Sequence, residues 1–183
     1  HASVLNFIDW TRECYGFTPD DVLTNVNPLH FDNSVFDIYA ALFNGACLAV
    51  FPRDVVAQGD LLLRRVDEYA CTSWFSVPSL LIYLDNMRLL HEGRFQTLKR
   101  IIFAGEGYPK ARLKTLFERF GARIPIHNAY GPTETTCLCS DYVVSARDFQ
   151  DLAGFAPLGR LAPNVSGLIL DEDGRPTPDG QVG

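Results

Sequence analysis

Residues 124–139 have the sequence Ile-Pro-Ile-His-Asn-Ala-Tyr-Gly-Pro-Thr-Glu-Thr-Thr-Cys-Leu-Cys, and they carry the clearest structural and chemical signals of this chain. Their apolar start predicts a strand that enters a core. Residues 128–132 then predict a tight turn, because Gly131 frees the backbone and Pro132 cannot donate to a strand ladder. A turn at the end of a buried strand presents its side chains in the crevice where open α/β sheets bind ligands.

Three side chains at this turn suit a nucleotide. Tyr130 offers a flat ring for stacking, Thr133 offers a hydroxyl for a phosphate oxygen, and Glu134 offers a hard oxygen ligand for Mg²⁺. The alternative is an ordinary strand-to-helix corner, in which Thr133 caps the helix, Glu134 favours its N-terminus and Tyr130 packs half-buried. The chemistry of the residues leaves both interpretations open.

The strand–helix alternation before Gly131 predicts an α/β fold with a mostly parallel, doubly wound sheet flanked by helices, followed by an antiparallel C-terminal tail. We expect an α/β layer over about residues 1–145 and a β-rich segment over about 155–183. Ser3 and Ser34 are the expected N-caps of the first two helices. The continuous apolar run at residues 46–51 predicts a strand buried on both faces. We expect Tyr69 and Met87 to lie on the inward faces of their helices, and Trp74 and Phe75 to be core residues. The expected helices cover residues 4–15, 34–43, 61–69, 80–87 and 110–120, and the expected strands cover residues 22–26, 46–51, 72–77, 98–104, 137–144 and 165–170, the last paired with a strand that starts at residue 180.

Composition narrows the class of protein. A chain of 183 residues with 47% hydrophobic residues is one domain or a large piece of one. The net charge of −6 and the absence of a basic stripe argue against a nucleic-acid partner. No apolar run reaches the roughly 18 residues of a membrane helix, so we expect no membrane partner. Five scattered cysteines without zinc spacing favour reduced thiols in a cytoplasmic protein.

The segment at residues 128–136, Asn-Ala-Tyr-Gly-Pro-Thr-Glu-Thr-Thr, closely resembles the signature of adenylate-forming enzymes. The likeness is greatest to the amino-acid-activating adenylation domains of nonribosomal peptide synthetases and to their stand-alone relatives. Other segments match this family in the same order, so the resemblance covers nearly the whole chain. It implies an internal fragment of the large N-terminal domain, because the phosphate loop of the family would precede His1 and its ribose-binding aspartate and C-terminal lysine domain would follow Gly183.

A second stretch, residues 31–38, bears on the substrate. Its sequence Phe-Asp-Asn-Ser-Val-Phe-Asp-Ile resembles the F-D-x-S-V motif of the family, in which the aspartate pairs with the α-ammonium group of the substrate. The alternative on pattern alone is that Asp32 only interacts favourably with the helix dipole. The resemblance gives Asp32 the ammonium-binding role and favours an amino acid over the fatty or aryl acids that related enzymes activate.

The resemblance also implies the other site residues. Residues 104–109, Ala-Gly-Glu-Gly-Tyr-Pro, are either an ordinary strand-to-helix loop or the family segment that lines the adenine pocket. Thr133 and Glu134 are the expected catalytic residues, with Thr133 at the α-phosphate and Glu134 on Mg²⁺. The implied nucleotide site consists of Gly105, Glu106, Gly107, Asn128, Ala129, Tyr130, Gly131 and Thr133. The implied amino acid pocket consists of Asp32, Asn33, Phe36, Ser76, Ile102, Ala104, Ala129, Cys137 and Leu138, a mostly apolar lining that suits a small or medium uncharged side chain.

The implied reaction joins ATP and an amino acid into aminoacyl-AMP and then transfers the aminoacyl group to the phosphopantetheine thiol of a carrier protein. We expect residues 1–183 alone to be inactive, because the phosphate loop and the catalytic lysine of the family are missing from them. The alternatives are an acyl- or aryl-CoA synthetase of the same superfamily and a non-catalytic fragment that docks a carrier protein.

Overall fold

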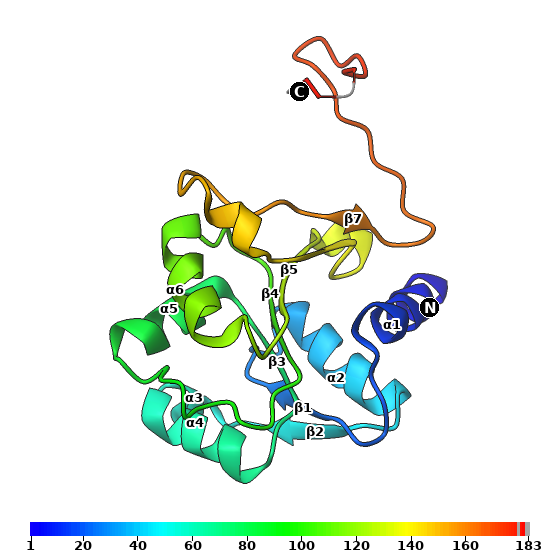
Figure 1. Ribbon diagram of the computed structural model, residues 1–183. Helices are drawn as coiled ribbons and strands as arrows, with labels where there is room; N and C mark the ends of the chain where they lie inside the picture. The colour runs from blue at the N-terminus through cyan, green and yellow to red at the C-terminus, as the bar shows by residue number, and fades with distance from the viewer. Residues whose placement is uncertain (179, 182–183) are drawn as a thin grey trace.

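The computed structural model describes residues 1–178 and 180–181. Its strands form one sheet in the order β2-β1-β3-β4-β5-β6-β7, in which the first five are parallel and the last two antiparallel (Figure 1). The predicted α/β class, with a mostly parallel sheet and antiparallel strands toward the C-terminus, is therefore confirmed. The strands are β1 (Val22–Asn25), β2 (Cys47–Val50), β3 (Ser73–Ser76), β4 (Arg100–Phe103), β5 (Ile126–Tyr130), β6 (Ser140–Val143) and β7 (Arg160–Leu161).

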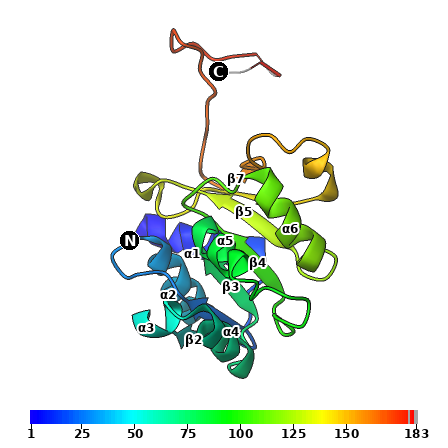
Figure 2. The ribbon, with the colours of Figure 1, turned by 90° about the vertical axis from the view of Figure 1, so that its left-hand side faces the viewer.

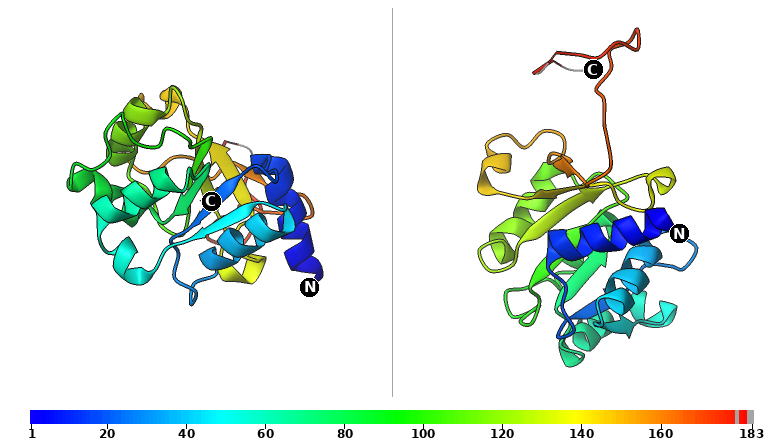
Figure 3. Two further views of the ribbon diagram at one scale, coloured as in Figure 1. Left: turned by 90° about the horizontal axis from the view of Figure 1, so that it is seen from below. Right: turned by 90° about the vertical axis from the view of Figure 1, so that its right-hand side faces the viewer.

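Helices cover both faces of the sheet (Figures 1 and 2). Figure 3 shows α1 and α2 together on one face, and α4, α5 and α6 pack on the other. The α-helices are α1 (Ala2–Tyr15), α2 (Asn33–Phe43), α3 (Arg53–Val56), α4 (Gly59–Glu68), α5 (Pro78–Asn86) and α6 (Lys110–Phe120), and the short 3-10 helices are η1 (Thr133–Thr135) and η2 (Ala146–Phe149). This doubly wound arrangement brings the ends of β1, β3, β4 and β5 to one edge of the sheet.

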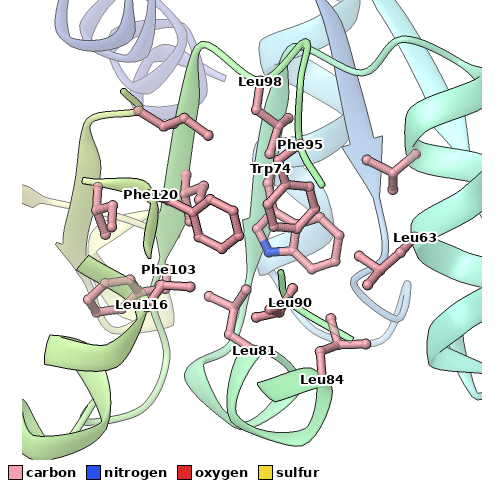
Figure 4. Close-up of a cluster of buried hydrophobic side chains, with 14 of the residues drawn as sticks. Leu63, Trp74, Leu81, Leu84, Leu90, Phe95, Leu98, Phe103, Leu116 and Phe120 are labelled. Atoms are coloured by element: carbon pink, nitrogen blue, oxygen red, sulfur yellow. The ribbon is translucent and has the colours of Figure 1, made fainter. Parts of the chain in front are cut away.

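Two hydrophobic cores result from the alternation of side chains along the strands. Trp74 joins the cluster under α4, α5 and α6, where it lies among leucine and phenylalanine side chains (Figure 4). Its neighbour Phe75 joins the cluster under α1 and α2, where its ring lies 4.4 Å from that of Phe36. In β4, Ile101 and Ile102 divide between the clusters in the same way. The expectation that Trp74 and Phe75 are core residues is confirmed.

Several local predictions were wrong at the ends of elements. His1 and Asp32, instead of Ser3 and Ser34, are the N-caps of α1 and α2. The Ser34 hydroxyl donates to the Phe31 carbonyl at 2.8 Å, since its helix begins one residue earlier than predicted. Residues 128–130 extend β5 instead of forming a turn, because they pair with residues 140–142 of β6.

Other errors concern burial. The strand at residues 46–51 was expected to be buried on both faces, but β2 is the edge strand and Val50 is 60% exposed. Met87 was expected to point inward, but it follows α5 and is 56% exposed. The predicted inward-facing Tyr69 is likewise exposed, one residue after α4. Each error occurs at an element's end, where the helical or strand period no longer fixes the direction of the side chain.

The C-terminal segment leaves the sheet after β7 (Figure 1). The predicted strand at residues 165–170 is not formed, and its described part shows an isolated bridge between Leu170 and Pro176. The partner strand was expected from residue 180, but residues 180–181 form no strand, and residues 182–183 lie outside the described residues. The division into a layer at 1–145 and a β-rich segment at 155–183 stays a prediction. Over the described part of the chain, no helix is both long and apolar enough to cross a membrane.

Candidate functional site

Two neighbouring cavities lie at the carboxyl edge of the parallel strands. The larger, which we call the Asp32 cavity, has a volume of about 500 Å³ and lies beside the start of α2. The smaller, the Tyr130 cavity, has a volume of about 430 Å³ and lies beside the end of β5. The residues that line both cavities are Gly105, Glu106, Gly131 and Pro132. A ligand with two parts can therefore occupy both spaces across a shared wall.

Asp32 is placed to bind a cation in the first cavity. It is the N-cap of α2, but its side chain makes no capping hydrogen bond. Its Oδ2 atom is buried and has no hydrogen-bond partner among the described residues. Burying a carboxylate oxygen without a partner is costly, and an ammonium group would remove that cost. The orphaned oxygen therefore marks a place for a positively charged ligand.

The structure places the predicted pocket residues in two groups. Asp32, Asn33 and Ser76 line the Asp32 cavity. The remaining predicted residues do not line it: Ala129 lines the Tyr130 cavity, and Phe36, Ile102, Ala104, Cys137 and Leu138 lie behind the cavity in the core under α1 and α2. Burial raises the pKa of the Cys137 thiol, so it is an inert apolar wall.

Other lining residues of the Asp32 cavity carry no local sequence signal. They come from the loop after β1, from the end of α3 and from the start of α5, which only the fold brings together. They are Val26, Asn27, Pro28, Phe31, Val56, Val77 and Leu80. Most are apolar, which agrees with the predicted preference for an uncharged side chain.

The Tyr130 cavity contains the predicted nucleotide-site residues except Thr133, which lines the Asp32 cavity instead. The Tyr130 side chain is 45% exposed and free to stack on a ring. Asn128 donates its amide N–H groups to the carbonyls of Ala156 and Pro157, at 3.3 and 2.9 Å. This contact fixes the segment after η2 as a wall, where Phe155 also lines the cavity. Asn128 therefore shapes the pocket through its amide group.

Glu134 lies outside both cavities. It is exposed on η1 and lines a separate groove against α1, together with Thr135, Thr136 and Asn6. No group of three or more potential metal ligands occurs among the residues that the structure describes. A single exposed carboxylate fits a Mg²⁺ ion whose other ligands are phosphate oxygens and water, and it does not fit a metal held by protein groups alone.

A buried carboxylate that the sequence did not single out lies under the Asp32 cavity. Asp37 in α2 accepts hydrogen bonds from the side-chain amides of Asn25 at 2.9 Å and Asn27 at 3.0 Å. Burial without a cation raises the pKa of Asp37 to about 8, although the amide hydrogen bonds oppose this shift. The sequence signal for a buried Asp37 was weak, because an aspartate in a helix is usually exposed to solvent. Only the packing of α2 against the sheet shows that this side chain is buried.

The chain resembles known proteins over its whole length. Residues 1–183 match the family described as AMP-binding enzyme. An L-proline--[L-prolyl-carrier protein] ligase of Pseudomonas fluorescens is 33% identical over 100% of this chain and 36% of that protein. A D-alanine--D-alanyl carrier protein ligase of Bacillus mycoides is 31% identical over 98% of this chain and 35% of that protein. The chain thus spans about a third of the length of these relatives.

Solved structures agree with the sequence comparison. The nonribosomal peptide synthetase FmoA3 (S1046A) superposes with a TM-score of 0.81 and 31% identity, over 97% of this chain and 19% of that chain. The matched family, the identity to these relatives and the shared fold lead to one assignment. The chain belongs to the AMP-binding enzyme family and has the fold of an amino-acid-activating adenylation domain.

Proposed function

We propose that the complete protein containing this chain activates an amino acid with ATP to form aminoacyl-AMP and pyrophosphate. The observation that carries the proposal is the pair of cavities with a common wall, one lined by Asp32 with its unpartnered oxygen and the other lined by the half-exposed Tyr130. An aminoacyl-adenylate has a matching shape, with an ammonium group at one end and a flat base at the other.

The proposed roles follow from these positions. Asp32 pairs with the α-ammonium group, and the ring of Tyr130 stacks on adenine. Thr133 lies on the Asp32 side of the shared wall, where its hydroxyl is suited to donate to the α-phosphate. Glu134 would hold Mg²⁺, which neutralises phosphate charge when it is bound. In this reaction the protein would act mainly by positioning the substrate carboxylate against the α-phosphorus and by stabilising the phosphate charge. It would form no covalent bond of its own to the substrates.

The second half of the proposed reaction is transfer of the aminoacyl group to the phosphopantetheine thiol of a carrier protein. This step is supported by the names of the relatives, which are ligases that join L-proline or D-alanine to a carrier protein. The apolar lining of the Asp32 cavity supports an uncharged amino acid side chain. The alternative is an acyl- or aryl-CoA synthetase. Asp32 argues against this alternative, because the simple carboxylic acid that such an enzyme activates has no ammonium group to pair with the Asp32 carboxylate.

The test is ATP–pyrophosphate exchange by the complete protein with each of the twenty amino acids. We expect exchange with one or a few uncharged amino acids. Exchange only with acids that lack an amino group would establish the synthetase alternative instead. A parallel assay of residues 1–183 alone is expected to show no exchange, and capture of a carrier protein by that inactive segment would favour the docking alternative.

A further inference from the structure

Asp37 is a buried carboxylate to which the proposed mechanism gives no role. It lies on α2, five residues after Asp32, and no ion pair of Asp37 occurs among the described residues. Its partners are the side-chain amides of Asn25 and Asn27, which follow each other closely at the end of β1. The carboxylate therefore ties the end of this strand to the helix that presents Asp32.

These contacts decide how the amide group of Asn27 is turned. The Asn27 Nδ2 group donates both to Asp37, at 3.0 Å from Oδ2, and to the Phe75 carbonyl, at 3.2 Å. Turning the amide over would place its oxygen against the Phe75 carbonyl, which has no hydrogen to donate, and would remove the Nδ2 hydrogen bond to Asp37. The Oδ1 atom of Asn27 is consequently directed away from Asp37 and stays available as an acceptor.

Asn27 lines the Asp32 cavity, and its Oδ1 accepts no hydrogen bond from the described residues. Asp32, whose buried Oδ2 has no hydrogen-bond partner among the described residues, lines the same cavity. Asn27 also borders a neighbouring cavity, where the guanidinium of Arg53 disfavours a cation. Two free acceptors in one cavity match an ammonium group, which has three N–H donors and no acceptor.

We propose that Asn27 is a second acceptor for the α-ammonium group of the substrate, beside Asp32, and that Asp37 is the positioning residue that turns the Asn27 carbonyl toward it. This inference rests on the proposed function, whose amino acid substrate supplies the ammonium group. It adds a binding residue from the loop after β1 to an ammonium site that the sequence motif assigned to the start of α2 alone.

The test compares an amino acid with its des-amino analogue in the complete protein. The readouts are the KM of the best amino acid in ATP–pyrophosphate exchange and the inhibition constant of the carboxylic acid that lacks the amino group. Asn27→Ala is expected to raise the amino acid KM about tenfold, the effect of losing one hydrogen bond to a charged group, with little change in kcat. The inhibition constant of the des-amino analogue is expected to stay unchanged.

Asp37→Asn is expected to raise the same KM, because the Asn27 amide is then no longer held in one orientation. The double variant Asn27→Ala/Asp37→Asn should be no worse than Asn27→Ala alone, since Asp37 acts through Asn27. Asp21→Asn is the matched control. Asp21 is a buried carboxylate next to the start of β1, at the opposite edge of the sheet, where it pairs with Lys99 at 3.0 Å. This control should leave the amino acid KM unchanged.

Two results would overturn the inference while the proposed function stands. One is an unchanged amino acid KM in Asn27→Ala. The other is an equal loss for the amino acid and for the des-amino analogue, which would indicate a merely structural role. Absence of amino-acid-dependent exchange in the unsubstituted protein is a separate outcome, and it would overturn the proposed function together with this inference.

Discussion

Glu106 and Ser79 are joined by two hydrogen bonds across the wall that separates the cavities. The Ser79 backbone N–H donates to Oε2 of Glu106 at 3.0 Å, and the Ser79 hydroxyl donates to Oε1 at 3.0 Å. Ser79 is the second residue of α5, so the carboxylate also lies at the positive end of a helix. This pair connects the loop after β4 to the helix whose first turn lines the Asp32 cavity.

Substitution Glu106→Ala should therefore weaken both halves of the site. We expect a loss of about 1 kcal/mol in the free energy of unfolding, as for removal of a helix cap, and a higher KM for both ATP and the amino acid. Glu106→Gln keeps one acceptor and should cause a smaller change in each quantity. Urea denaturation and exchange kinetics measure the two effects. If KM for both substrates stayed constant while stability fell, the pair would be a helix cap only.

Asp32→Ala should separate recognition of the amino group from recognition of the carboxylic acid. Removing the carboxylate leaves the substrate ammonium without its charged partner, and we expect a loss of amino acid affinity of at least about tenfold. Affinity for a des-amino acid should be unaffected or improved. Calorimetric titration of each ligand in the complete protein measures this difference. An equal loss for both ligands would argue that Asp32 supports the fold of α2.

The buried Asp37 should make folding stability depend on pH. Its pKa is about 8 in the folded protein and close to 3.8 in the unfolded chain, so the folded state binds one more proton between these values. Stability from this group is fully present below about pH 4 and is lost as pH rises toward 8. The nearby Cys137 thiol stays protonated in this range, because burial raises its pKa.

Substitution Asp37→Asn removes this proton linkage. We expect the free energy of unfolding of the variant to fall less steeply than that of the original protein between about pH 4 and pH 8, the window set by the two pKa values. Denaturant unfolding at several pH values provides the measurement. Parallel pH profiles in the two proteins would mean that Asp37 is ionised in the folded state throughout.

Gly131→Ala should disrupt the turn between β5 and η1. A Cβ atom at this position would lie 2.6 Å from the Cys137 carbonyl oxygen and 2.8 Å from the Cys139 backbone nitrogen, and it would also meet the Leu138 Cα. Backbone atoms cannot rotate away, so we expect destabilisation of about 1–3 kcal/mol or more and loss of exchange activity.

Gly167→Ala is the matched control for Gly131→Ala. Its added Cβ would meet only the flexible side chain of Leu161, at 2.9 Å. Thermal unfolding of the two variants should show a large decrease in Tm for the first and a small one for the second. Equal decreases would show that the chain from η1 to β6 can shift to admit a side chain.

The strand–helix order was predictable because hydrophobic period is a local property. The run at residues 98–104 identified β4, and the helix at Lys110–Phe120 was predicted with its observed bounds. Which strands pair with each other was harder to predict from the sequence. The chain at residues 128–130 resembles a turn until β6 pairs with it, and this pairing depends on residues ten or more positions further along.

For the candidate site, too, local features were predictable from the sequence and contacts between distant segments were not. The sequence by itself determined the fold class and the two informative motifs, and it predicted roles for Asp32 and Tyr130, because these depend on residues that are neighbours in the chain. Only the tertiary structure decided that Asp32 keeps an unpartnered oxygen and that Asn27 shares its cavity. The physical reason is that hydrogen-bond satisfaction and burial depend on contacts between β1, α2 and β3, which the fold brings together from distant parts of the chain.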